Sequence, residues 1–152
     1  MPALAHRAND AWEALLTAHA VLIKQFTAED IWDEVSMREY DVLYALSKCQ
    51  DPINMTELNR HVLLSQPALS RLVDRLAERG LVGRRPDPAD GRGVLLSLTE
   101  AGRAVQRQIG RQHARGVARA MTAGLTRGEL AQLETLCRKL AWANDTSEVP
   151  IP

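Results

Sequence analysis

The sequence has no long hydrophobic run. No stretch of its 152 residues approaches the roughly 18–20 consecutive apolar residues that a helix needs to cross a bilayer. The first residues also lack the pattern of a secretory leader, which is a basic segment followed by an apolar one and a small-residue cleavage site. We therefore expect a cytoplasmic protein with no membrane partner.

Cysteine and histidine are too few and too scattered to define a metal site or a disulfide framework. Cys49 and Cys137 lie far apart, and the four histidines show no paired ligand spacing. The chain also lacks a phosphate-binding loop, a nucleophile elbow and a catalytic metal motif. We therefore expect no enzymatic activity and no cofactor.

Net charge is absent as well, because nineteen basic residues balance nineteen acidic ones. The balance changes when the chain is divided into segments. Residues 1–59 have four basic and ten acidic groups, a net charge of −6, whereas residues 60–119 have twelve arginines and five acidic groups, a net charge of +7. Residues 120–152 have a net charge of −1. A basic middle segment is typical of nucleic-acid binding, and an uneven solvated surface is the alternative.

What the chain does contain is a series of amphipathic helices with clear start signals. Each begins with a serine, threonine or asparagine that can cap free backbone N–H groups, except the first, which is predicted from helical spacing of apolar residues alone. The predicted helices are Leu4 to Phe26, Ser36 to about Lys48, Asn54 to about Val62, Ser65 to Glu78, Thr99 to about Ala123, and Thr126 to about Asn144.

The helix that begins at Ser65 is followed by a different pattern. Pro67 suits the first turn of this helix, and Gly80 suits the left-handed position after its end. Residues 81–85 and 94–98 then predict two short strands, separated at 86–93 by a loop dense in turn-forming residues. A short helix, a serine-capped helix and a basic hairpin in this order predict a winged helix-turn-helix domain.

This arrangement suits B-DNA, because a helix fits the major groove and a hairpin tip reaches the neighbouring minor groove. The N-terminal residues of the helix approach the bases first, whereas Arg75 lies further along and suits a phosphate. An ordinary amphipathic surface helix is the alternative. The predicted contacts on this helix are Ser65, Gln66, Ala68, Ser70, Arg71 and Arg75.

The hairpin, or wing, adds further predicted DNA contacts. Arg84 and Arg85 at its base are predicted to contact phosphates, although they could also be plain surface. Arg92 lies between two glycines on the predicted turn and can be presented to the negative potential of a narrow minor groove. A turn made of ordinary turn residues is the alternative.

Four segments together resemble the MarR family of transcriptional regulators: Ser65–Val82, Arg84-Arg85, Asp90-Gly-Arg92 and Leu98–Gly102. The resemblance implies a homodimer that binds a pseudo-palindromic operator, usually represses nearby genes, and is released by a small, often phenolic, ligand. It also implies that Arg92 enters the minor groove and that Asp90 helps to hold it.

The expected fold class is mainly α (α+β). Residues 36–99 form the winged helix-turn-helix domain, residues 1–35 and 100–144 form dimerisation helices, and residues 145–152 form a flexible tail. The terminal helices have apolar stripes that need a partner, so a two-fold dimer is predicted, with a monomer as the alternative. The predicted core of the winged domain consists of Leu58, Val62, Leu69, Leu72, Val73, Leu76, Leu96 and Leu98.

The effector site implied by the resemblance lies between the dimer helices and the winged domain. Aromatic walls with a few polar groups could orient a carboxylate or a phenol there, and core packing is the alternative for each side chain. A thiol-based redox sensor of the same fold is a second hypothesis, which requires an exposed cysteine with a lowered pKa. The candidate ligand-binding residues are Trp12, His19, Tyr40, Asp41 and Tyr44.

Overall fold

The computed structural model describes residues 1–145, and all six predicted helices are present with ends within about two residues of those expected. Of the tail predicted at 145–152, residues 146–152 lie outside the described part. The elements are α1 (Pro2–Thr27), α2 (Met37–Ser47), β1 (Ile53–Asn54), α3 (Met55–Arg60), α4 (Gln66–Glu78), β2 (Val82–Asp87), β3 (Asp90–Leu98), α5 (Glu100–Gly124) and α6 (Arg127–Asn144).

The helices begin where the capping residues predict. At the start of α2, the Glu39 backbone N–H donates to Ser36 Oγ (3.2 Å), and the Ser36 N–H donates to the Glu39 carboxylate (2.8 Å). The same reciprocal pair begins α6. Gly80 follows α4 with a φ of +72°, the only positive φ in residues 1–145, and a residue with a Cβ would be strained there.

The wing differs from the prediction in one respect. Much of the loop expected at 86–93 is strand, and only residues 88 and 89 form the turn between β2 and β3. Pro86 pairs with Val94 on β2, an edge strand of the sheet, which is where proline is tolerated in a sheet. A third strand, β1, was not predicted. It pairs with β3, so the antiparallel order is β1-β3-β2.

The hydrophobic core lies in the winged domain and extends onto the first half of α5. Leu43 and Leu69 are fully buried there, and Val105 and Ile109 of α5 join the same cluster. Every predicted core residue is buried except Val62, which follows α3, is partly buried and packs against the core. Gly102 begins this junction, where a Cβ would collide with the Leu81 carbonyl oxygen.

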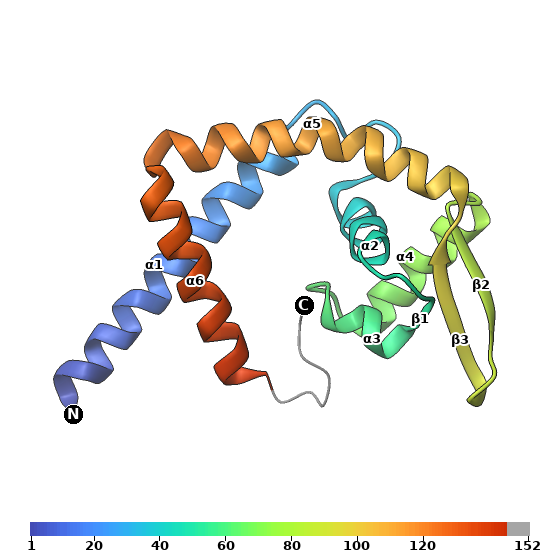
Figure 1. The fold of residues 1–152 in the computed structure, drawn as a ribbon, viewed down its shortest axis with the longest axis horizontal. Helices are drawn as coiled ribbons and strands as arrows, with labels where there is room; N and C mark the ends of the chain where they lie inside the picture. Colours follow the sequence, from blue (N-terminus) through green and yellow to red (C-terminus); the bar gives the residue numbers. More distant parts are fainter. Residues whose placement is uncertain (146–152) are drawn as a thin grey trace.

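Two regions are therefore distinct in Figure 1. The winged domain, with α2, α3, α4 and the sheet, lies at one end of α5, whereas α1 and α6 cross in this view below the other end. Phe26 is the only buried residue of α1, and α6 has none in its described length. No helix within residues 1–145 combines the length and apolar character that a membrane span requires.

Candidate DNA-binding surface and effector cleft

Helix α4 separates an inner apolar face from an outer polar one. Leu69, Leu72, Val73 and Leu76 are buried on its inner face. Ser65 caps the helix by accepting the Ala68 N–H at 3.3 Å, and Pro67 lies in the first turn. Gln66 and Arg71 are exposed and Ala68 and Ser70 are half-buried, so the structure brings the predicted base contacts to one end of one helix.

The wing presents Arg85 and Arg92 without ion-pair partners among the described residues. Contrary to the prediction, Arg92 lies near the start of strand β3 and not on a turn between flexible glycines. Asp90 holds this segment through the backbone, because its carboxylate accepts the Arg92 N–H at 3.1 Å. Arg84, Arg85 and Arg92 also line a shallow hollow on the wing, with a volume of about 400 Å³.

Two arginines predicted as phosphate contacts are paired within the protein. Arg84 Nη1 donates to Asp74 Oδ1 of α4 at 2.6 Å. Arg75 Nε lies 3.8 Å from the carboxylate of Glu39, whose side chain is 12% exposed. The acidic partners Glu39 and Asp74 were missed as site residues, because the pairs join elements whose spatial relation the sequence pattern does not define.

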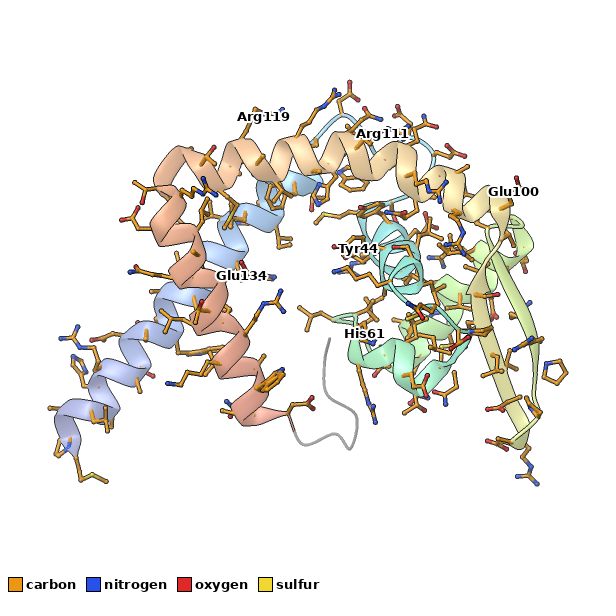
Figure 2. All side chains as sticks on the ribbon, in the orientation of Figure 1. Tyr44, His61, Glu100, Arg111, Arg119 and Glu134 are labelled. Carbon is orange, nitrogen blue, oxygen red and sulfur yellow. The ribbon has the colours of Figure 1, made fainter. Side chains whose placement is uncertain are left out.

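The net charge of +7 for residues 60–119 is not confined to the winged domain. Of the twelve arginines in the basic segment, seven belong to residues 60–99 and five belong to α5, so the +7 does not describe the winged domain alone. Figure 2 shows Arg111 and Arg119 on α5, away from the recognition helix. The five arginines on α5 are Arg103, Arg107, Arg111, Arg115 and Arg119.

The structure brings three of the five predicted effector residues together between α2 and α5. Tyr40, Asp41 and Tyr44 line a cavity of about 710 Å³, opposite Gln106 and Arg107 of α5. The rings of Tyr40 and Tyr44 stack with centroids 5.9 Å apart. Tyr40 also packs in the core, as the packing alternative predicts, whereas Tyr44 is 43% exposed.

His19 lines a second cavity of about 520 Å³ between α1, the start of α2 and residues 62–64, and Asp41 lines this cavity too. Trp12 is 57% exposed on α1 and lines neither cavity. Partial desolvation raises the pKa of the Asp41 carboxyl, and the nearby His113 opposes the shift. Burial likewise raises the pKa of the Tyr40 hydroxyl.

His113 of α5 was not predicted as a site residue, but it lines the cavity between α2 and α5. Its Nδ1 is 3.2 Å from the Glu29 carboxylate, and its ring contacts those of Phe26, Trp32 and Tyr40 at centroid distances of 5.2–5.6 Å. Gly116, one turn further along α5, leaves room for Glu29, because a Cβ there would collide with its carboxylate. Helical spacing on α5 could have placed His113 and Gly110 on one face, but not opposite α2.

Cys49 lacks the exposed, low-pKa thiol that the redox-sensor hypothesis requires. Burial, reinforced by Glu57, raises the pKa of the half-buried Cys49 thiol, which is the opposite of the shift that favours a reactive thiolate. Its Sγ donates to the Ala45 carbonyl at 3.4 Å. Cys137 is exposed on α6. Within residues 1–145 no group of three or more metal-ligating side chains is present.

Comparison with known proteins agrees with this architecture. A family model described as "MarR family" matches residues 34–93. The multiple antibiotic resistance protein MarR of Escherichia coli K12 is 34% identical over 107 residues, which cover 70% of this chain and 74% of that protein.

Two solved structures from Streptomyces coelicolor are also similar. The MarR family transcriptional regulator Sco3205, in complex with DNA, has a TM-score of 0.78 and 27% identity over 95% of this chain and 91% of its own. The transcriptional regulator PcaV, in complex with its natural ligand, has a TM-score of 0.66 and 30% identity over 89% of this chain and 92% of its own.

The fold and the exposed arginines of α4 and the wing define a winged helix-turn-helix DNA-binding protein, a transcriptional regulator and not an enzyme. The sequence identity with the E. coli protein, and the share of both chains that it covers, identify the family within this class of regulators. The chain belongs to the MarR family.

Proposed function

We propose that the protein is a homodimeric repressor that binds a pseudo-palindromic operator and is released from it by a small aromatic or phenolic ligand. The observation that most directly supports recognition of the operator sequence is that α4 and the wing each present an exposed arginine. The exposed Arg71 suits a guanine in the major groove, and the unpaired Arg92 suits the adjacent minor groove. Arg85 supplies a phosphate contact beside them.

The dimer is supported by the uncovered apolar side chains of the terminal helices. Trp12 and Leu16 on α1 and Leu140 and Trp142 on α6 are all more than half exposed in the single chain. Contiguous apolar faces of this kind mark protein–protein contacts. A two-fold axis through these helices would place two copies of α4 about 34–36 Å apart, one turn of B-DNA.

The effector site is supported by the two cavities that share Asp41. Both lie where the winged domain meets the long helices, and their volumes of about 710 and 520 Å³ suit small ligands. Aromatic walls from Tyr40 and Tyr44, with Arg107 opposite, would orient an anionic aromatic compound. The similar transcriptional regulator PcaV has been solved in complex with its natural ligand, which supports a ligand site in this fold.

A gel-shift experiment with the DNA that flanks the gene tests this proposal. The wild-type protein should retard the DNA, and Arg92→Ala should weaken binding with little change in melting temperature. Arg71→Ala should cost about 1–3 kcal/mol on the operator and relax the preference at one base pair. Equal losses on operator and random DNA would contradict base reading by Arg71.

The same gel shift, repeated with a panel of aromatic acids and phenols, tests the effector. A compound that releases the operator from the wild-type protein should lose this effect with Tyr44→Ala. Failure to bind any DNA at low salt would overturn the main proposal, whereas DNA binding that no compound affects would remove only the effector part.

A further inference from the structure

An acidic residue lies at the centre of the surface that is proposed to face DNA. Asp74 is on the outer face of α4, one turn after Arg71 and opposite the buried stripe. Its side chain is 55% exposed. An unpaired carboxylate in this position would repel the phosphate backbone, because DNA has a negative charge about every 1.7 Å along its axis.

The structure shows what compensates this charge. Arg84 of β2 reaches α4 and donates a short, charge-assisted hydrogen bond from Nη1 to Asp74 Oδ1 at 2.6 Å. Arg84 also lines the hollow of the wing together with Arg85 and Arg92. One guanidinium therefore joins the recognition helix to the wing, the two elements that would enter neighbouring grooves.

The neighbouring arginine provides a contrast on the same strand. Arg85 is exposed and has no ion-pair partner in residues 1–145. Arg84 pairs across the sheet with the buried Leu96 and reaches Asp74 of α4, whereas Arg85 pairs with Leu95 and has no such contact. The two consecutive arginines, which look equivalent in the sequence, thus have different surroundings.

We propose that Asp74 and Arg84 are a positioning pair that sets the orientation of the wing relative to the recognition helix, and that Arg84 is not a phosphate ligand. The inference rests on the proposed operator reading by α4 and the wing. Rigid placement of both elements lets one docking geometry satisfy both grooves, so losing the pair reduces operator affinity even though the removal of Asp74 also removes a negative charge.

The experiment compares Asp74→Asn, Arg84→Gln, the double variant and a charge-swapped variant, Asp74→Arg with Arg84→Asp. The probe is the duplex that the wild-type protein selects from a random-sequence pool. Each single variant should weaken binding by up to about fivefold, the range expected of a half-exposed ion pair. The double variant should be no weaker than either single one, and the charge-swapped variant should recover most of the affinity.

Salt dependence separates positioning from phosphate binding, and Arg85→Gln is the matched control. Loss of one phosphate contact reduces the slope of log affinity against log salt by about 0.9. We expect this reduction for Arg85→Gln and an unchanged slope for Arg84→Gln. A reduced slope for Arg84→Gln, or tighter binding by Asp74→Asn, would overturn the proposal.

Hydrogen–deuterium exchange of the free protein tests the Asp74–Arg84 pair without depending on DNA binding. Asp74→Asn and Arg84→Gln should increase exchange of β2 and β3 to the same extent, and the charge-swapped variant should restore protection. If the wild-type protein selects no duplex, the proposed function fails, and the pair is judged by exchange alone. Unchanged protection in both single variants would then refute it.

Discussion

The winged domain and the terminal helices α1 and α6 are built from similar amphipathic helices. Their apolar faces are buried in the winged domain and exposed on α1 and α6. In the winged domain, α2, α4 and the sheet cover one another, and Leu43 and Leu69 are fully buried. On α1 and α6, side chains as large as Trp12 and Trp142 remain in solvent. The core of the first region is complete within one chain, whereas the apolar side chains of the second remain exposed in the single chain.

This difference assigns separate tasks to the two regions. A region whose core is complete can hold Arg71 and Arg92 at fixed positions whatever happens elsewhere in the molecule. A region whose apolar faces are open is suited to association with another surface. Helix α5 connects the two regions, because its first half belongs to the core of the winged domain. Substitutions of the same kind should therefore have different effects in the two regions.

The largest effect is expected in the winged core. Leu43→Ala removes a fully buried side chain of α2 and should lower the free energy of unfolding by about 2–5 kcal/mol. Leu63→Ala, at a position that is 91% exposed, is the matched control and should change stability little. Urea denaturation at one fixed protein concentration measures both. A loss below 1 kcal/mol at Leu43 would mean that the core is loosely packed.

A substitution at the junction between the winged domain and α5 should lower the stability of the fold nearly as much. Gly102→Ala places a methyl group against the Leu81 carbonyl oxygen and should destabilise the fold by about 1–3 kcal/mol. Gly124→Ala is the control, because a Cβ there meets nothing within 4 Å, and alanine in place of glycine should stabilise by about 0.5 kcal/mol. Thermal melting that shows the two variants shifted in the same direction would contradict this account of the junction.

On the terminal helices, the same leucine-to-alanine change should act on association. Leu16 is 51% exposed on α1. If a second copy covers it, burial contributes roughly 1.5–3 kcal/mol per side chain, so Leu16→Ala should raise the dimer dissociation constant at least about tenfold. Sedimentation equilibrium measures this, and Leu63→Ala should leave it unchanged. An unchanged constant for Leu16→Ala would show that this face lies outside the interface.

The helices could be predicted from the sequence because their signals are local. A capping residue acts within three positions, as Ser36 and Glu39 do, and an apolar stripe repeats within one turn. The same locality made Gly80 and the position of α4 predictable. The outer face of α4 and the exposure of Arg71 on it followed from these elements, since the buried stripe leaves only one side free.

The remaining features depend on contacts between distant segments. Turn-forming residues at 86–93 favoured a loop, but cross-strand pairing with β2 makes most of them strand and places Arg92 on β3. The pairing of Arg84 with Asp74, and of Glu29 with His113, joins residues 10 and 84 positions apart. Such contacts determine whether an arginine forms an ion pair, and this cannot be predicted from the amino-acid composition.

The smallest predicted effect lies where the two regions meet, at Asp41. Because its pKa is raised in the folded state, the ionised carboxylate is less favourable in the fold than in the unfolded chain. This cost is absent below the ordinary aspartate value of 3.8 and develops as the pH rises through the higher folded value. Asp41→Asn should therefore raise the melting temperature by about one or two degrees near neutral pH, and the gain should shrink toward acid pH.

Melting curves recorded at a series of pH values measure this gain, with Asp33→Asn in the exposed loop before α2 as the control. The control should show no comparable dependence on pH. A gain for Asp41→Asn that persisted unchanged into acid would have to come from packing and not from charge. A loss of stability at neutral pH would mean that the carboxylate has a favourable partner, and that the cavity between α2 and α5 accommodates its charge without cost.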